Sequence, residues 1–455
     1  MHPLRLSLFA LLLLAVLGFS GEADAKEPLW NYTTGFQVTS VAISADGEYI
    51  AVGSDDDNVY LFDKDSSTPL WNYTTRDDVG AIAISAEGDY IAAGSDDNNV
   101  YLFYRNSSTP LWNYSIPTDG MSGDPWGGVE SVAISADGDY IAVGCGPAVW
   151  VFNKNNSAPL WRDFVEGHSV KSVAISASGE YIAAGTHNGS DDSGVYLFHK
   201  SSETPLWRYS TGIVDSVAIS ADGEYIVTGS NDDKIYLFGK DNNTPLWSYT
   251  TYSGVTSVTI SADGKYIAAG SQDRKVYLFE KGNSTPLWSF LTGDIVLSVA
   301  ISADGEYIVA SSTYLFDRTL YLFDKDSSTP LWHYTHEGFI VSVGISADGE
   351  YIVAGDGPKV YLFDKNPGQG GGGGDGGSSA EEAVCQHGDS KLADDGFNQC
   401  ICNDGKWLCT DVKYEEKDDD SNATGDGKEE DSRLPSLSLL AVVTILGIIS
   451  ILRRR

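Results

Sequence analysis

Basic residues and cysteines are scarce in this sequence, and each scarcity excludes a class of protein. Lys and Arg together number 29 against 64 Asp and Glu, which gives a formal net charge of −35 over 455 residues. A surface so acidic repels phosphate backbones, so we expect no nucleic-acid partner. The stretch 26–366 holds one cysteine, Cys145. No disulfide can form within this stretch, and we interpret Cys145 as a small residue of a loop or of the core.

Recognisable catalytic motifs are also missing. The sequence holds no Gly-x-Ser-x-Gly nucleophile elbow, no phosphate-binding loop and no Asp-x-Asp-x-Asp-Gly calcium loop. The histidines of the stretch 26–366 are scattered without the spacing of metal ligands: His168, His187, His199, His333 and His336. The sequence therefore does not predict an enzyme, and a catalytic site would have to be assembled across several repeats.

What the sequence does contain is a repeat. Pro-Leu-Trp and Ile-Ser-Ala-x-Gly each recur eight times between residues 28 and 366. One unit predicts four short strands, at 40–43, 49–53, 59–62 and 69–73, because β-branched and aromatic runs alternate there with turn residues. Four strands in about 40–45 residues are typical of a propeller blade.

The order of strands at the two ends of the repeat predicts how the ring closes. The repeat region begins with a fourth strand, at 28–32, and ends with a third strand, at 360–363. We therefore expect the N-terminal strand to complete the last blade, which hides the edges that an open array would expose. The predicted fold of residues 26–366 is an all-β, eight-bladed β-propeller closed by its N-terminal strand.

Two families share these motifs. The segment Val-x-Ser-Val-Ala-Ile-Ser-Ala-Asp-Gly-x-Tyr-Ile-Ala-x-Gly-Ser resembles the middle of a WD40 repeat, without the Trp-Asp pair and with only one Gly-His pair, Gly167-His168. Residues 59–63 and 69–74 resemble the tryptophan-docking repeat of quinoprotein (PQQ-like) propellers. That resemblance implies either a scaffold of envelope assembly or a quinone-dependent dehydrogenase. The sequence lacks the vicinal cysteines and the metal-binding cluster of the dehydrogenases, so we predict no PQQ cofactor.

Loop lengths distinguish the two faces of the predicted propeller. Loops between strands one and two and between strands three and four are nearly uniform, whereas the other face carries insertions at 115–128, 186–194 and 311–320. Because binding residues sit on loops held by a rigid scaffold, we predict that this second face, the insertion face, binds a protein or glycan. The candidate binding residues are Trp126, Phe164, His168, Asp191, Asp192, Tyr252, Tyr314 and Phe339.

Aspartates are frequent on the same face, at 55–57, 96–97, 191–192, 232–233 and 273. Turn formation between the second and third strands is the favoured explanation. Weak Ca²⁺ binding is the alternative, and it needs several oxygen ligands to converge.

Both ends of the sequence predict a place outside the cell. Residues 1–25 read as a signal peptide, with Ala23-Asp24-Ala25 before a mature N-terminus at Lys26. Residues 434–452 are apolar and long enough for a transmembrane helix, and the basic tail 453–455 is expected to be cytoplasmic. This end also resembles the tripartite sorting signals of prokaryotic surface proteins, in which the span is cleaved. We predict a single-pass protein of the plasma membrane whose propeller lies on the extracellular face of the membrane.

Sequons agree with this topology and are compatible with glycosylation. The candidates are Asn31, Asn72, Asn106, Asn113, Asn155, Asn188, Asn242, Asn283 and Asn422.

A small module is predicted between the propeller and the membrane. A Gly-rich linker at 367–384 precedes a module at 385–410 that contains four cysteines, and an acidic stalk follows at 411–433. Outside the cell four cysteines imply two disulfides, with zinc as the alternative. The stretch 395–410 resembles pacifastin-type and von Willebrand C-type modules, with Phe397 in place of the second cysteine and no sixth. The resemblance implies the pairs Cys385–Cys402 and Cys400–Cys409, and a role as a spacer.

Three functions fit these features. The first is a non-catalytic binding or scaffold protein that uses the insertion face. The alternatives are an extracellular quinoprotein-type oxidoreductase and a structural or adhesive component of the cell surface.

Overall fold

The computed structural model describes residues 24–117, 128–165, 169–187, 193–313, 317–366, 390–392, 399–403 and 406–409. They belong to two units, within 1–381 and 382–455. The linker at 367–384, the stalk at 411–433 and the apolar stretch at 434–452 lie outside the described residues, as does all of the signal peptide before Asp24. Among the described residues, no helix has the length and apolar character needed to cross a membrane.

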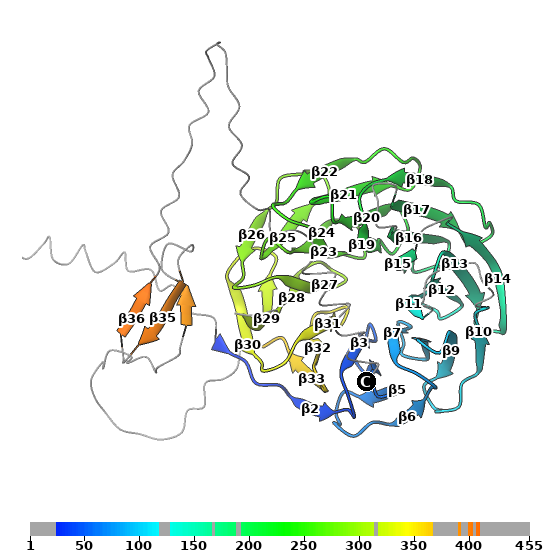
Figure 1. Cartoon of the computed structure of the whole chain (residues 1–455), viewed down its shortest axis with the longest axis horizontal. Coiled ribbons are helices and arrows are strands. Elements are labelled where there is room, and N and C mark those ends of the chain that lie inside the picture. Colours follow the sequence, from blue (N-terminus) through cyan, green and yellow to red (C-terminus); the bar gives the residue numbers. More distant parts are fainter. Residues whose placement is uncertain are drawn as a thin grey trace, which may run out of the picture. The chain divides into compact units, whose positions relative to one another are not determined.

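The first unit is a ring of eight four-stranded antiparallel sheets, the blades (Figure 1). The innermost strands are β3 (Val38–Ile43), β7 (Val79–Ile84), β11 (Val129–Ile134), β15 (Ser169–Ile175), β19 (Val214–Ile219), β23 (Val255–Ile260), β27 (Val296–Ile301) and β31 (Ile340–Ile345). The second strands are β4 (Tyr49–Ser54), β8 (Tyr90–Ser95), β12 (Tyr140–Cys145), β16 (Tyr181–His187), β20 (Tyr225–Ser230), β24 (Tyr266–Ser271), β28 (Tyr307–Thr313) and β32 (Tyr351–Asp356).

The third and outer strands complete the blades. The third strands are β5 (Asn58–Asp63), β9 (Asn99–Tyr104), β13 (Ala148–Asn153), β17 (Gly194–His199), β21 (Lys234–Gly239), β25 (Lys275–Glu280), β29 (Arg318–Asp324) and β33 (Lys359–Asp364). The outer strands are β6 (Trp71–Thr74), β10 (Trp112–Ser115), β14 (Asn156–Phe164), β18 (Trp207–Ser210), β22 (Trp247–Thr250), β26 (Trp288–Leu291), β30 (Pro330–Thr335) and β2 (Trp30–Thr33). We number the blades 1 to 8 from β3–β6 to β31–β33 with β2.

The core lies between neighbouring blades. The second and third strands of a blade are buried on both faces, as their continuous apolar runs require. One apolar cluster joins Val59 and Leu61 of blade 1 to Ile91, Tyr101 and Phe103 of blade 2. Each blade therefore depends on its neighbours for burial, and an isolated repeat could not form such a core.

Each Pro-Leu-Trp motif joins one blade to the next. The indole Nε1–H of Trp71 donates to the carbonyl of Arg105 in blade 2 at 2.6 Å, and its ring packs on Phe103 with centroids 5.3 Å apart. All eight tryptophans repeat this contact, at 2.6–3.1 Å from the carbonyl and 5.3–5.6 Å from the Phe ring. The repeated tryptophans are thus structural residues.

The ring closes as predicted. Strand β2, the first in the repeat region, pairs antiparallel with β33 and completes blade 8. The junction between blades 8 and 1 has the same kind of apolar core as the others, with Leu362 of blade 8 against Phe62 of blade 1. A circle of backbone hydrogen bonds near the first turn of every blade also closes here, because Ala347 N–H donates to the carbonyl of Ala45 at 2.9 Å.

Seven of the eight junctions gain a further bond from a serine on the innermost strand. The hydroxyl oxygen of Ser40 accepts from Ile82 N–H of blade 2 at 3.2 Å, and six other junctions repeat it at 3.0–3.3 Å. At the junction of blades 2 and 3 the position is Ala81. The pairing of the innermost strand shifts by one residue just before each of these positions, so each blade carries a bulge there.

An additional strand covers blade 7. Strand β1 (Asp24–Ala25) runs parallel to β30, with Asp24 opposite Trp332. The next residue, Lys26, is 6% exposed, and its ammonium lies 3.0 Å from Asp364 Oδ1 and 2.7 Å from the carbonyl oxygen of Asn366. Trp332 is fully buried. Both ends of the propeller chain therefore meet at the outer edge of blades 7 and 8.

The second unit contains one described sheet, formed by β34 (Ser390–Leu392), β35 (Gln399–Asn403) and β36 (Lys406–Cys409). The strands are antiparallel, and Cys400 is the register partner of Cys409. Cys385 lies outside the described residues. The two disulfides and the likeness to pacifastin-type modules stay predictions.

Candidate functional site

The two faces of the propeller differ in how closely they keep the repeat. On the uniform face, each first turn holds a glycine with positive φ that packs on a tyrosine of the preceding blade. Gly47 has φ +74°, and a Cβ there would lie 2.6 Å from Cδ2 of Tyr351. A lysine or arginine covers most of these tyrosines, as Lys154 covers Tyr90 at 4.6 Å. These contacts are repeated around the ring, so this face is occupied by blade-to-blade packing.

Aspartates of the insertion face also have structural partners. Asp56 accepts from the hydroxyl of Tyr60 at 2.6 Å and from the backbone N–H of Gly35 in the preceding loop. Asp97, Asp273 and Asp317 bond a tyrosine hydroxyl and a loop N–H in the same way. Each such carboxylate ties the loop between blades to the hairpin of the next blade. The turn explanation for these aspartates is the one that the contacts favour.

Hydrogen bonds lower the pKa of one of these aspartates, Asp97. Burial acts to raise the pKa of Asp97, but bonds from Tyr101, Asn99 and Arg76 N–H outweigh it and lower the pKa below its usual value. Asp97 is therefore a carboxylate whose oxygens are already engaged.

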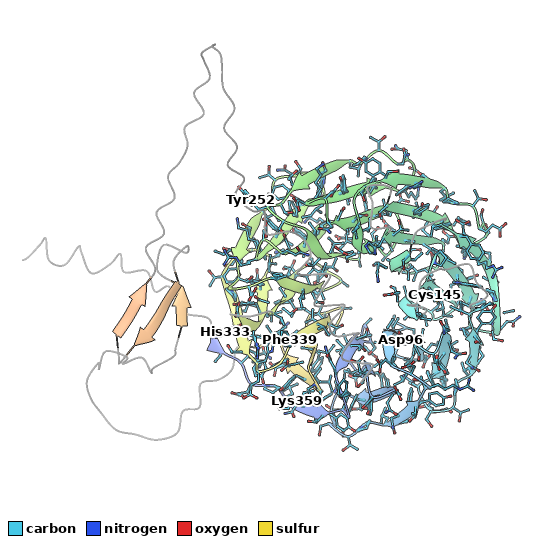
Figure 2. The ribbon with its side chains drawn as sticks, in the orientation of Figure 1. Asp96, Cys145, Tyr252, His333, Phe339 and Lys359 are labelled. Atoms are coloured by element: carbon cyan, nitrogen blue, oxygen red, sulfur yellow. The ribbon has the colours of Figure 1, made fainter. Side chains whose placement is uncertain are left out.

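Three exposed aromatic side chains of the insertion face each lie beneath a basic group. Tyr252 is 85% exposed, with the ammonium of Lys275 5.3 Å from its ring centroid. The guanidinium of Arg318 lies 5.0 Å from the ring of Phe339, and that of Arg162 lies 4.8 Å from Phe164. Figure 2 labels Tyr252 and Phe339, which come from different blades. Such cation-covered rings offer apolar area and charge together to a partner.

The sequence interpretation missed Phe36, which is 60% exposed in the loop between blades 8 and 1. Phe36 follows Gly35 as Phe339 follows Gly338 one blade earlier. The repeated Gly-Phe pair was a signal that could have identified it. The basic residues Arg162, Lys275 and Arg318 were missed as well, because contact between a cation and a ring is a matter of cross-strand register.

Only three of the eight predicted binding residues are described: Phe164, Tyr252 and Phe339. Trp126, His168, Asp191, Asp192 and Tyr314 lie outside the described residues. The third predicted insertion, at 311–320, is largely strand. Thr313 pairs with Arg318, so the extra residues lengthen the hairpin of β28 and β29 instead of forming a loop.

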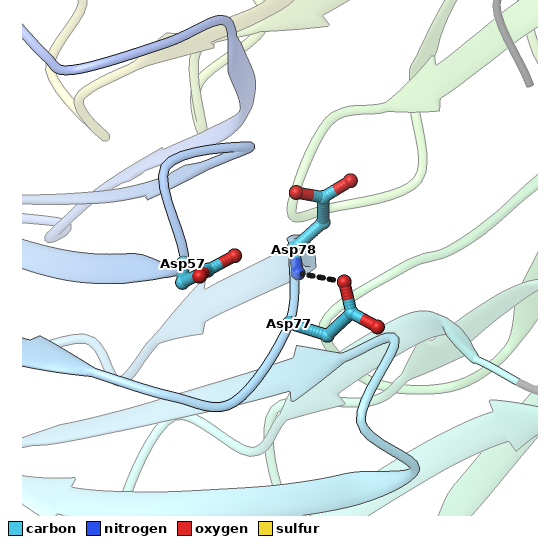
Figure 3. Close-up of side chains that lie close together, drawn as sticks. All are labelled: Asp57, Asp77 and Asp78. Carbon is cyan, nitrogen blue, oxygen red and sulfur yellow. Dashed lines mark hydrogen bonds between the residues drawn. The ribbon is translucent and has the colours of Figure 1, made fainter. Parts of the chain in front are cut away.

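Three carboxylates on the insertion face come close enough to share a cation. One oxygen each of Asp57, Asp77 and Asp78 lies within 4.8 Å of the others (Figure 3). The pKa of Asp57 is raised, first by burial and then by the charges of Asp77, Asp56 and Asp97. Three carboxylates are fewer than the six to eight oxygens that Ca²⁺ takes. Weak Ca²⁺ binding stays a prediction, and this cluster is where the described residues would place it.

Blade 8 differs from the other blades beneath Phe339. His336 stands where five other blades have a buried threonine, and its Nδ1 lies 3.2 Å from Asp356 Oδ1. The two side chains are 0% and 4% exposed, and Nε2 of His336 has no hydrogen-bond partner among the described residues. The pair holds the loop that carries Gly338 and Phe339 against the end of β32.

A second departure from the repeat lies on three successive innermost strands. The bulge positions of blades 3, 4 and 5 are Glu130, Lys171 and Asp215, and the Lys171 ammonium lies 3.0 Å from Glu130 Oε2. The side chain of Asp215 is exposed to solvent. Protein atoms nearby nevertheless desolvate its carboxyl group and raise its pKa to about 6, against the opposing effect of Lys171.

Comparisons with protein families divide the propeller between two repeats. The family model described as outer membrane protein assembly factor BamB matches residues 21–209. The WD domain, G-beta repeat, matches residues 204–238, 243–280 and 285–324. The chain is thus a β-propeller with PQQ-like and WD40-like repeats, as the sequence motifs predicted. Neither match extends to the cysteine module.

Solved structures show the same fold at low sequence identity. Sqt1 of Chaetomium thermophilum, solved with the N-terminus of ribosomal protein L10, is 18% identical with a TM-score of 0.63, over 74% of this chain and 100% of that one. The computationally designed Ika8 protein is 16% identical with a TM-score of 0.60, over 73% and 98% of the two chains. Curated protein sequences give no match. At these identities the likeness concerns the fold alone.

Proposed function

We propose that this chain is a non-catalytic binding protein whose propeller holds a protein partner, or a protein-borne glycan, on the insertion face. One observation carries the proposal: the face departs from the repeat and presents exposed, cation-covered aromatic side chains at Phe164, Tyr252 and Phe339. Exposed aromatic and arginine side chains are the groups that most often dominate protein interfaces. The other face is occupied by repeated contacts between blades.

The likeness to known propellers supports the same class of function. The neighbour Sqt1 was solved with a bound protein segment, and propellers as a class present binding loops on a rigid scaffold. Because folds host many functions, this likeness adds to the argument from the face and does not replace it.

Site-specific crosslinking tests the proposal. A photoreactive amino acid at Tyr252 or Phe339, in the full chain on cells, is expected to crosslink a discrete partner. The matched control carries the same group at Asp65, on the three–four loop of the uniform face, where we expect no such product. Equal crosslinking from both faces would contradict a binding role for the insertion face and would instead favour a structural or adhesive coat component.

A spectroscopic experiment addresses the oxidoreductase alternative. The purified protein is mixed with PQQ and Ca²⁺, and the mixture is then passed over a desalting column. We expect the absorbance of the quinone to stay with the small-molecule fraction. Absorbance that elutes with the protein would support the alternative.

We further propose that the propeller stands outside the cell, anchored by residues 434–452. The sequence features of residues 1–25 and 434–455 support this location. Protease added to intact cells is expected to remove the propeller from the cell fraction, whereas an intracellular control protein stays intact. Resistance of the propeller in intact cells, with cleavage after lysis, would contradict the location.

A further inference from the structure

The circumference of the propeller carries a ring of exposed leucines. The leucine of each Pro-Leu-Trp motif precedes the outer strand or, in β14 and β30, lies within it. Seven of the eight side chains are 50–57% exposed: Leu29, Leu70, Leu111, Leu160, Leu206, Leu246 and Leu287. Apolar residues repeated along the free edges of outer strands favour edge-to-edge association. In seven blades the rim thus places an exposed apolar side chain beside the outer strand of a sheet.

The eighth leucine is less exposed than the other seven. Leu331, in blade 7, is half-buried and packs with the apolar cluster of blades 7 and 8. Strand β1 pairs with the outer strand β30 beside it, and Lys26 continues this pairing with a bond from its N–H to the carbonyl of His333 at 2.8 Å. The predicted cleavage after Ala25 would remove β1 from the mature chain, but Lys26 would still pair with the outer strand of blade 7.

Sequons accompany the leucines of six other blades. In blade 1, Leu70, Asn72 and Thr74 are exposed, whereas the alternating side chains of Trp71 and Tyr73 pack inward. Leu70 and Asn72 therefore project from the same side of the chain. Blades 8 and 2 repeat this arrangement with Asn31 beside Leu29 and Asn113 beside Leu111.

In three more blades the sequon lies in the turn that leads into the outer strand. Asn155, Asn242 and Asn283 are exposed and precede Leu160, Leu246 and Leu287 by four or five residues. Blade 7, whose outer strand pairs with Lys26, has no sequon in its outer strand or in the turn before it. Blade 4 has Arg208 at the position of Asn72, with its guanidinium 5.3 Å from the ring of Tyr196.

We propose that N-linked glycans on these outer strands and turns cover the leucine rim, which in blade 7 is bordered by the N-terminal segment at Lys26. The glycans are bulky and soluble, and they stand where the outer edges would otherwise pair with another copy. Every described sequon asparagine lies on the circumference or the three–four loops, so the described part of the insertion face stays bare. The proposal rests on the extracellular location proposed above.

Two measurements test it. Protein isolated from the surface of its own cells is digested after enzymatic deglycosylation in heavy-oxygen water, and we expect labelled aspartate at Asn31, Asn72 and Asn113. Unmodified asparagine at all three would overturn the proposal. This measurement is independent of any partner, so it can succeed even if crosslinking from Tyr252 fails.

The second measurement uses paired variants that differ only in whether the sequon survives. Thr33→Ala, Thr74→Ala and Ser115→Ala together abolish the three strand sequons, and Thr33→Ser, Thr74→Ser and Ser115→Thr together preserve them. In a glycosylating host the alanine variant is expected to self-associate several-fold more than the conservative one in size-exclusion chromatography with light scattering.

In a host without N-glycosylation the two variants are expected to self-associate equally, which separates loss of the glycan from loss of the hydroxyl. Circular dichroism verifies that both are folded. Equal, low self-association of the two variants in the glycosylating host would refute the covering role.

Discussion

At the scale of single residues, the thiol of Cys145 illustrates how position controls reactivity. It stands at the end of β12, where five other blades have a serine, and its Sγ lies 3.3 Å from the carbonyl of Gly128. Burial raises the pKa of Cys145 to about 12, and the charges of Glu130 and Asp96 act in the same direction. The thiolate, which is the reactive form, is therefore rare at neutral pH.

We predict that folded Cys145 reacts very slowly with iodoacetamide at pH 8, where only roughly one thiol in ten thousand would be ionised. The same thiol should react rapidly in denaturant. Mass spectrometry of the tryptic peptide that contains Cys145 measures both rates. Comparable rates in the folded and denatured protein would show that the site is open.

Asp215 should make stability depend on pH in an identifiable window. Its pKa in the folded protein, about 6, lies above the ordinary value of 3.8. Between these values the folded state binds more protons than the unfolded state, so the contribution of Asp215 to stability falls as pH rises toward 6. Above pH 6 the full penalty of the ionised carboxylate remains.

We predict that Asp215→Asn changes the melting temperature little at pH 4 but raises it relative to wild type at pH 7.5. Lys171 keeps its contact with Glu130 in the variant, so it gains no unpaired charge. Thermal melts of the two proteins at both pH values measure the effect. A difference in melting temperature that is the same at pH 4 and pH 7.5 would mean that Asp215 is not the titrating group.

At the scale of elements, the cysteine module offers a clear test. Cys400 and Cys409 are register partners in β35 and β36, the placement that a cross-strand disulfide requires. We predict the pairs Cys385–Cys402 and Cys400–Cys409 in the extracellular protein. A peptide map without reduction identifies the linked peptides. Any other pairing, or four free thiols in protein collected from the cell surface, would refute this arrangement.

Elements with a repeated pattern were predictable, and elements outside the pattern were not. The Pro-Leu-Trp motif placed β2 and β6 to within two residues of their bounds, whereas β14 begins three residues before its motif. By contrast, β1 falls within the predicted signal peptide, because two residues that pair with a distant strand leave no periodic signal. The long hairpin of β28 and β29 looked like a loop because its extra residues, Ser311 to Leu320, break the repeat.

At the scale of the whole molecule, the ring should fail as a unit if its closing strand is removed. Deletion of residues 24–33 removes β1, Lys26 and β2, and with them the packing of Trp30 and Tyr32 on Phe62. Trp30 and Tyr32 are half-buried, so each contributes less than the about 3–5 kcal/mol that truncation of a fully buried aromatic residue costs. Together with the pairing of β2 with β33, their loss is still large against the stability of a typical domain, about 5–15 kcal/mol.

We predict that the propeller without residues 24–33 is largely unfolded or aggregated, since blade 8 then lacks its outer strand. The matched control lacks residues 367–455, keeps all eight blades and should melt as the full chain does. Denaturant titration followed by tryptophan fluorescence compares the two. A truncated ring that unfolds at the same midpoint as the control would contradict closure by β2.

The fold could be predicted from the sequence, whereas the candidate site on the insertion face could be predicted only in part. The reason is physical. A propeller depends on contacts that recur in every repeat, such as Trp71 with Phe103. Because the residues that make them recur, they can be recognised in the amino-acid sequence. The face depends on contacts that occur once. Two examples are the contact of Arg318 with the ring of Phe339 and the buried pair of His336 and Asp356. Both arise from strand register and burial, which only the three-dimensional structure shows.

The contacts of Lys26 with Asp364 and Asn366 also have a mechanical consequence. The last described residue of the propeller, Asn366, is bonded to Lys26, which belongs to the first segment of the same domain. Any tension along the chain beyond Asn366, toward the predicted anchor, reaches the ring at this bond and at the neighbouring contact with Asp364. The load is thus shared between the first and last strands before it reaches a blade. A tethered propeller built in this way resists being pulled open at its own seam.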